Sequence, residues 1–177
     1  RNVTIKAITD THLQDLWIHP VLKQDNKSGV ITVSIKLSSV MNGKKSAKFV
    51  LADKLGNKLL CEDIVLTDSK DMIEGYVKAE IVRVIPWDNH NPYLYHTFVE
   101  LYEDEQLVEV VPYKVGFRRL EIIDKVIHLN GKRLVLLGVN RHEWSPKTGR
   151  SIGMEEMQSD MRKKKKNNKE KNGNLDV

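Results

Sequence analysis

The sequence is poor in cysteine, in aromatic residues and in long apolar runs. Its lone cysteine, Cys61, excludes an internal disulfide and fits a reducing, cytoplasmic setting. No apolar run approaches the roughly 20 residues that a membrane-spanning helix needs, and the N-terminal residues show no signal-peptide pattern. The 177 residues are also fewer than a complete (β/α)8 barrel requires. These absences exclude a disulfide scaffold, a complete barrel and, by our interpretation, a membrane partner.

Most of the chain carries no excess of basic over acidic residues. The formal net charge is +5, but residues 162–177 hold seven basic residues against two acidic ones, and the remainder has equal numbers of both. A basic surface is therefore not built into the fold, and we expect no nucleic-acid partner. Because residues 162–177 are almost without apolar side chains, we predict a tail that is disordered or forms a frayed helix end.

Alternation of apolar and polar residues predicts strands. From Val30 to Leu37 every second residue is apolar, which is the pattern of a strand with one buried face. Leu13 to Leu22 is apolar enough for a strand but contains Pro20, which confines it to a sheet edge or a strand end. The alternation recurs in five further segments: Lys48 to Ala52, Leu59 to Leu66, Tyr76 to Val84, Tyr95 to Tyr102 and Leu107 to Val115.

Strands at roughly ten-residue spacing with no helix between them indicate an antiparallel β-sandwich of immunoglobulin-like size. We assign this domain to 11–117. In residues 1–10, Val3 and Ile5 alternate with polar neighbours, and no helix cap precedes them. We therefore predict that 1–10 is a strand leaving a preceding domain.

After Phe117 the pattern changes to a hairpin. Asn130-Gly131 readily supplies the two positive φ angles of a type I′ turn. We expect this turn to join Val126 to Leu129 with Arg133 to Leu137.

A candidate site follows the hairpin. The branched run from Leu134 suits a strand buried on both faces, and it stops at Gly138 before a dense polar cluster. Function gathers where such strands end, so the cluster is the candidate site. A helix is predicted next, from methionines at helical spacing with two acidic residues near its start: Met154, Met157, Met161, Glu155 and Glu156. We assign 118–161 to a hairpin and the first strand and helix of an incomplete (β/α)8 barrel. With the sandwich before it, the predicted fold is mainly β.

Five short motifs then suggest a family. They are Ile85-Pro86-Trp87, Asn91-Pro92-Tyr93-Leu94-Tyr95, Val115-Gly116-Phe117-Arg118, Leu129-Asn130-Gly131-Lys132, and Gly138-Val139-Asn140-Arg141-His142-Glu143 with Pro146 and Gly149-Arg150. In this order and spacing, the stretch from Leu13 to Asp160 resembles the β-galactosidases of glycoside hydrolase family two.

The resemblance implies a domain order of sugar-binding jelly roll, immunoglobulin-like sandwich, catalytic barrel and further β domains. On that template 1–10 is the exit strand of the jelly roll, 11–117 the sandwich and 118–161 the opening of the barrel. After Asp160 the sequence departs from the family pattern, in which an apolar-faced helix leads to a strand end carrying a second sugar-binding histidine.

The implied reaction is retaining hydrolysis of terminal β-galactosides such as lactose, which uses two carboxyl groups about 5–5.5 Å apart. In the family both are glutamates on later barrel strands, and the magnesium ligands are also downstream. We therefore expect no catalytic residue, metal or cofactor in this chain. His142 matches the family's galactose-binding histidine, whose N–H can donate to a sugar hydroxyl. Asn140, Arg141 and Glu143 are supporting candidates that would orient the loop.

Simpler interpretations stay open beside these. A lone histidine such as His142 is more often a surface or structural residue. A metal pair of His142 with Glu143 is disfavoured, because adjacent residues of an extended chain point to opposite faces. We expect Cys61 to be a small buried residue. The aromatic side chains could stack on sugars, but we favour a place in the core or at a domain interface: Trp17, Trp87, Tyr93, Tyr95 and Tyr102.

We therefore interpret the chain as an internal fragment of a cytoplasmic β-galactosidase that is inactive by itself. Its partners would be the neighbouring domains of the parent, with the galactoside bound only by the parent, and a homo-oligomer is compatible with this role. The alternatives are a non-catalytic β-sandwich that binds carbohydrate or protein, and the same region of a β-glucuronidase or β-mannosidase.

Overall fold

The structure is a computed structural model, and it describes residues 3, 5, 7–38, 43–69, 72–136, 144–145 and 147–172. The chain consists of two compact units, Arg1–Val135 and Leu136–Val177. Among the described residues, all the strands belong to the first unit and the single helix belongs to the second.

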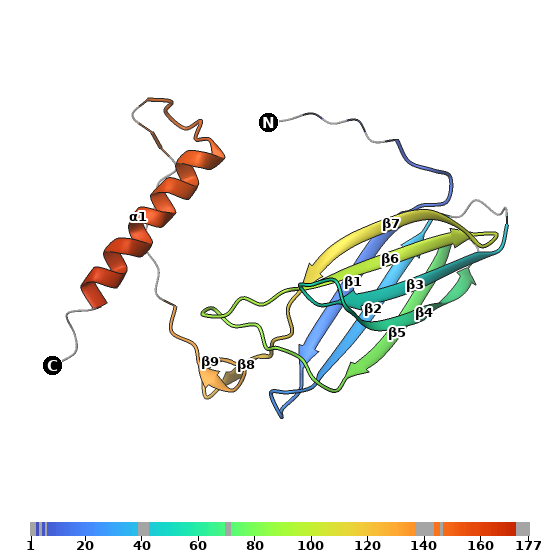
Figure 1. Cartoon of the computed structure of the whole chain (residues 1–177), viewed down its shortest axis with the longest axis horizontal. Coiled ribbons are helices and arrows are strands. Elements are labelled where there is room, and N and C mark those ends of the chain that lie inside the picture. The colour runs from blue at the N-terminus through green and yellow to red at the C-terminus, as the bar shows by residue number, and fades with distance from the viewer. Residues whose placement is uncertain are drawn as a thin grey trace. The chain divides into compact units, whose positions relative to one another are not determined.

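Seven antiparallel strands of the first unit form one curled sheet (Figure 1) with the order β1-β2-β5-β4-β3-β6-β7. The sheet changes layer within β4, which pairs with β3 up to Ile64 and with β5 from Val65 onward. The two layers share one core, so the predicted mainly-β antiparallel sandwich is confirmed. The strands are β1 (Leu13–Leu22), β2 (Gly29–Leu37), β3 (Lys45–Ala52), β4 (Lys58–Ser69), β5 (Met72–Ile81), β6 (Tyr95–Glu103) and β7 (Gln106–Val115).

The core forms where the inner faces of the two layers meet. The alternation along β2 is confirmed, because its four inward residues are almost fully buried: Ile31, Val33, Ile35 and Leu37. Burying a side chain of this size stabilises the fold by about 1.5–3 kcal/mol. The opposite layer contributes Phe49, Leu51, Val99 and Leu101 to the same cluster.

The two edge strands each carry a proline. Pro20 lies in β1 and Pro112 in β7, the first and last strands of the sheet. Of the two predicted positions for Pro20, an edge or a strand end, the structure shows the edge, where a residue without an N–H leaves no further strand unpaired. The edges are tied at one end, where the Leu13 N–H donates to Glu109 Oε2 at 2.7 Å.

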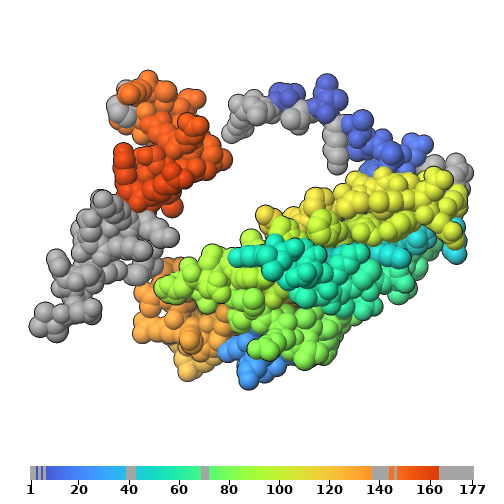
Figure 2. All heavy atoms as spheres, in the orientation of Figure 1, coloured from blue at the N-terminus to red at the C-terminus, as the bar shows by residue number. Residues whose placement is uncertain are grey.

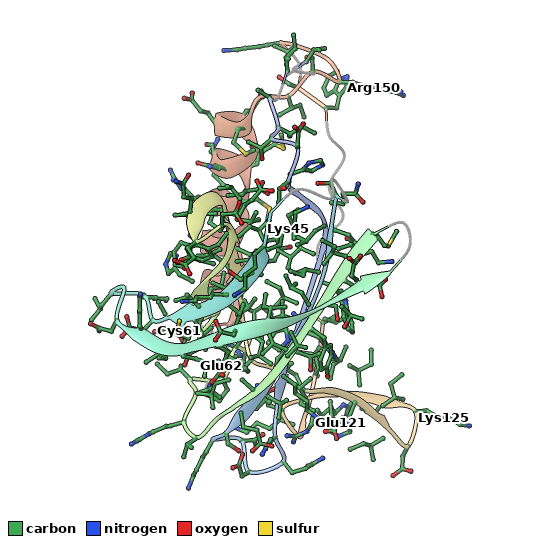
Figure 3. All side chains as sticks on the ribbon, turned by 90° about the vertical axis from the view of Figure 1, so that its right-hand side faces the viewer. Lys45, Cys61, Glu62, Glu121, Lys125 and Arg150 are labelled. Atoms are coloured by element: carbon green, nitrogen blue, oxygen red, sulfur yellow. The ribbon has the colours of Figure 1, made fainter. Side chains whose placement is uncertain are left out.

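A three-stranded sheet, β10-β9-β8, follows the sandwich and belongs to the same compact unit. Its strands are β8 (Leu120–Ile123), β9 (Val126–Leu129) and β10 (Lys132–Arg133). The predicted turn is confirmed, with φ values of 54° at Asn130 and 81° at Gly131. Strand β8 was not predicted; it meets β9 through a second turn, whose tip Figure 3 marks at Lys125. In Figure 2 the orange hairpin atoms lie beside the blue β1–β2 turn.

Two predicted strands do not form among the described residues. In 1–10, residues 3, 5 and 7–10 belong to no sheet, and Leu134 to Leu136 follow β10 without strand structure. A strand is stable only beside pairing partners, and a barrel strand needs neighbours that lie far along a sequence. Residues 137–139, the rest of the predicted barrel strand, are outside the described residues.

The helix of the second unit, α1 (Met154–Asn172), starts where it was predicted, with Glu155 and Glu156 in its first turn. It continues past 161 into the segment for which we predicted disorder or fraying. Lysine and glutamate lose little side-chain freedom in a helix, and basic residues near the C-terminus favour the helix dipole. Within the described residues, no helix combines the length and apolarity that crossing a membrane would take.

Several buried or aromatic residues can now be placed. Tyr95 is buried in the core, as we expected. Trp17 is not part of the core, because 57% of it is exposed. The expectation that Cys61 is buried is wrong: it is exposed on β4, beside Glu62 in Figure 3. Most of the first part of β4 is exposed, so residue type alone misled us there.

Candidate functional site

The predicted sugar-binding residues are Asn140, Arg141, His142 and Glu143, and all four lie outside the described residues. Their roles therefore stay predictions.

The described loop that follows them has a defined turn. Ser145 and Gly149 exchange two backbone hydrogen bonds. The Ser145 N–H donates to the Gly149 carbonyl at 2.8 Å, and the Gly149 N–H donates to the Ser145 carbonyl at 2.9 Å. Gly149 has a φ of 63°, a conformation that favours glycine. Ser145 is buried, whereas 62% of Trp144 is exposed. Ser145 and Gly149 are thus held together shortly before α1 begins.

Four of the five family-like motifs converge at one end of the sandwich, where the hairpin begins. The Trp87 N–H donates to the Phe117 carbonyl at 2.8 Å, and Pro86 and Phe117 form a parallel β-bridge. We call the cluster of Trp87, Phe117, Arg118, Arg119 and Asn130 the junction.

Asn130 is the polar centre of the junction. Its backbone N–H donates to the Arg119 carbonyl at 2.8 Å, and its Oδ1 accepts the Arg119 N–H at 2.9 Å. Its Nδ2 donates to the Trp87 carbonyl at 3.0 Å. One side chain therefore joins the hairpin turn, the start of β8 and the loop before β6, with each hydrogen bond contributing about 1 kcal/mol.

Arg119 ties the hairpin to the β1–β2 turn. Its Nη1 donates to the Lys23 carbonyl at 2.6 Å, and its Nε donates to Glu121 Oε2 at 2.8 Å. Glu121 also accepts a hydrogen bond from Gln24 Nε2 at 3.2 Å. The hydrogen bond from Arg119 is the main cause that lowers the pKa of Glu121. The carboxylate is therefore held ionised as part of a structural ion pair.

Phe117 is the junction residue that is fully buried in the core. Its ring stands nearly perpendicular to the Tyr95 ring, with centroids 5.4 Å apart at 83°. Tyr95 Oη accepts the Ile85 N–H at 2.7 Å, an arrangement like the tyrosine corner of immunoglobulin-like domains. Burial raises the pKa of Tyr95. The tyrosine thus acts as a neutral structural acceptor.

Three residues of the junction, Trp87, Arg118 and Arg119, also line a groove of about 630 Å³ along β1 and the end of β7. The Arg118 guanidinium lies over the Trp87 ring, 4.9 Å from its centroid. Among the described residues, no aspartate or glutamate lines the groove, so these residues do not supply the paired carboxyl groups of glycoside hydrolysis. The junction is a structural clamp in this unit.

Metal binding also finds no support in the described part of the chain. It contains no group of three or more histidine, cysteine, aspartate or glutamate side chains placed to hold a metal ion.

The sequence interpretation missed Arg119 and Glu121. The third motif was taken to end at Arg118, one residue before the side chain that makes the ion pair. A usable signal was present: opposite charges two residues apart on a strand lie on the same face.

Two family models match the chain. The model of glycosyl hydrolases family 2 matches residues 11–118, and the model of the glycosyl hydrolases family 2 TIM barrel domain matches residues 120–172.

The chain is also similar to named relatives. It is 38% identical over 170 residues to the β-galactosidase large subunit of Lactobacillus acidophilus, a match covering 95% of this chain and 26% of the relative. It is 40% identical over 173 residues to the β-galactosidase large subunit of Lactobacillus helveticus, a match that also covers 95% of this chain and 26% of the relative. It is 38% identical over 172 residues to the β-galactosidase of Streptococcus thermophilus, covering 95% of this chain and 16% of that relative. The chain thus spans about a quarter, or less, of the length of these relatives.

Solved structures share the fold. The β-glucuronidase of Parabacteroides merdae aligns with a TM-score of 0.71 at 22% identity, over 86% of this chain and 19% of that chain. The β-glucuronidase of Bifidobacterium dentium, solved with coumarin-3-O-glucuronide, aligns with a TM-score of 0.69 at 16% identity. That match covers 81% of this chain and 24% of that chain. At these identities the likeness establishes the fold alone.

Proposed function

Because the chain belongs to glycosyl hydrolase family 2, we propose that its parent protein is a retaining β-galactosidase acting on terminal β-D-galactosides such as lactose. The carrying observation is 38–40% identity, across 95% of the chain, to three proteins named β-galactosidase. The family-model matches over both units support the same conclusion.

Within the parent, this chain would provide the immunoglobulin-like domain and the opening of the catalytic barrel. The junction supports that role, since Asn130 and Arg119 fix the hairpin to the end of the sandwich. The first barrel segments would then leave from a rigid base. The two carboxyl groups that act as acid/base and nucleophile would come from the rest of the parent.

His142 is the proposed contact with galactose. An imidazole N–H can donate to a sugar hydroxyl whose hydrogen bond strengthens at the transition state. Asn140, Arg141 and Glu143 are proposed to orient the loop that carries it. The closed turn at Ser145 and Gly149 supports a defined conformation for the segment that follows.

We also propose a cytoplasmic parent whose partners are its own neighbouring domains, a galactoside and further copies of itself. The single cysteine is consistent with a reducing compartment. Any magnesium would be bound by residues of the parent outside this chain.

The decisive experiment compares the purified 177-residue chain with the full-length parent on a chromogenic β-galactoside. We expect turnover by the parent and none by the chain alone. Turnover by the pure chain that survives repeated chromatography would refute the division of roles. A full-length parent that cleaves a β-glucuronide or β-mannoside faster than the galactoside would establish one of the related activities instead.

The role of His142 is tested in the full-length parent. The His142→Ala variant should lose roughly 10²–10³-fold in kcat, the loss expected for one donor to the transition state. His90→Ala, which removes an exposed histidine of the loop before β6, is the matched control and should retain activity. Equal activity of both variants would remove His142 from the site.

A further inference from the structure

A row of aromatic and apolar side chains crosses the outer face of the β1-β2-β5-β4 layer. Trp17 pairs with Ser34, Ser34 with Tyr76, and Tyr76 with Val65, so the four residues lie in one line across four strands. Val33 and Ile35, the neighbours of Ser34 along β2, point into the core, so Ser34 and the rest of this row lie on the outer face. Trp17, Tyr76 and Val65 are 57%, 51% and 70% exposed.

The row holds two aromatic rings at a defined separation. Trp17 and Tyr76 are two strands apart, which places their backbones about 9.5 Å from each other. The Trp17 ring stacks on His19, with centroids 5.1 Å apart and an interplanar angle of 21°. His19 covers one side of the ring and is not part of the hollow that Trp17 lines. Trp17 is therefore oriented before any ligand arrives.

A hollow of about 340 Å³ lies along this row, and both Trp17 and Tyr76 line it. The next row of side chains supplies a polar wall, formed by Asp15, Lys36, Glu74 and Thr67. Lys36 Nζ and Glu74 Oε1 are 3.4 Å apart, which leaves Asp15 as the one other charged group of the lining. The hollow thus combines aromatic faces with hydrogen-bonding groups and carries little net charge.

This combination selects among ligand classes. A stable protein interface uses roughly 20–30 residues a side, more than the ten that line the hollow. An anionic ligand is disfavoured, because the lining has two carboxylates and one ammonium group. Small-molecule sites begin at about 300 Å³ and pair apolar surface with a few placed polar groups, as here.

We propose that this face is a binding site for a neutral carbohydrate, with sugar rings stacked on Trp17 and Tyr76 and hydroxyl groups bonded to Asp15, Lys36 and Glu74. The separation of the aromatic residues suits a short oligosaccharide of linked pyranose rings better than a single sugar. The inference goes beyond the proposed hydrolase activity, because the face includes none of the residues assigned to it.

The test is calorimetric titration of the 177-residue chain with lactose and with a longer neutral galacto-oligosaccharide. We expect saturable binding with a Kd on the order of millimolar, tighter for the longer sugar. Trp17→Ala and Tyr76→Ala should each weaken binding by about tenfold or more, because each removes one stacking surface. Tyr76→Phe keeps the ring and should stay within about twofold of the original affinity.

Trp144→Ala is the matched control, since Trp144 is similarly exposed but lies in the other unit. It should leave the affinity unchanged, and circular dichroism should show that all variants keep the strand signal. Absence of saturable binding, or equal loss in Trp144→Ala, would overturn the proposal. A Trp17→Ala variant that keeps its sugar affinity but loses self-association in sedimentation would also overturn it, by identifying the face as a contact between copies.

Discussion

Asn130 and Arg119 hold each other through two reciprocal hydrogen bonds, one from the backbone N–H of Asn130 and one to its side-chain oxygen. The same Asn130 adopts a φ of 54°, a conformation that asparagine tolerates better than most residues. Turn geometry and side-chain bonding therefore both depend on this one residue.

Replacing Asn130 by alanine should lower the free energy of unfolding by about 2–4 kcal/mol. The substitution removes the bonds to Arg119 N and Trp87 O, and alanine tolerates the left-handed region less well than asparagine, whose polar side chain can bond locally. Denaturant unfolding followed by tryptophan fluorescence measures the effect. Asn130→Gly keeps the conformation and should cost less than the alanine variant, so the difference isolates the backbone contribution. Equal losses would mean that the conformation contributes nothing.

A methyl group at Gly29 should disturb the core. A Cβ built there would lie 2.6 Å from Cδ1 of Phe117, whose ring is fully buried. We expect Gly29→Ala to destabilise the sandwich by about 1–3 kcal/mol, the cost of overpacking. Gly153→Ala, where a Cβ would meet nothing within 4 Å, should leave the melting temperature of the sandwich unchanged. A neutral Gly29→Ala would show that the Phe117 ring can shift freely.

The stabilisation by Asp25 should depend on pH. The Ser28 hydroxyl, followed by the N–H groups of Lys27 and Ser28, bonds to its carboxylate and lowers its pKa to about 2. The folded pKa is below the unfolded value of about 3.9, so the stabilisation is present above that value and is lost as the pH falls through about 2. The stability difference between the original chain and Asp25→Asn should therefore shrink over this window in pH-dependent unfolding.

Removing the first cause of that shift provides the control. Ser28→Ala should raise the pKa of Asp25 toward its ordinary range, which NMR titration of the carboxyl carbon measures directly. An unchanged titration would mean that the backbone N–H groups alone hold the carboxylate.

Pro20 should protect the β1 edge against strand addition. Pro20→Val would restore an N–H on an edge strand and raise β-propensity, so we expect faster aggregation in light scattering at equal concentration. His19→Val adds a similar side chain to the same strand without adding a donor and should aggregate more slowly. If both variants aggregate equally, apolar surface and not backbone pairing would be responsible.

Much of the sandwich was predictable because half-buried strands alternate. β2 follows this rule throughout. Trp17 obeys the same rule, because it is exposed between the partly buried Leu16 and Ile18, and it was residue type, not alternation, that suggested a place in the core. The turn between β9 and β10 was predictable for a different reason, because Asn130-Gly131 favours positive φ angles locally. Strand β8 lacks alternation altogether, with Leu120, Ile122 and Ile123 all exposed. Whether a segment without alternation forms a strand depends on its pairing with other segments, which its own sequence does not show.

The candidate site was less predictable than the fold. His142 was singled out by its motif and not by any spacing of acid, base or metal ligands, and it lies outside the described residues. The junction motifs were recognised as sequence, but their mutual contacts depend on tertiary structure. Arg119 reaches Lys23 and Asn26 across more than 90 positions of the chain, a separation at which local patterns carry no information.

Strand β4 belongs to both layers, since it pairs with β3 through its first part and with β5 through its second. Neither layer can detach without pulling a continuous backbone segment out of the other. We therefore expect the amide protons of β3 and β5 to exchange with solvent only through a shared global opening. Unfolding of the sandwich should accordingly be a single cooperative transition.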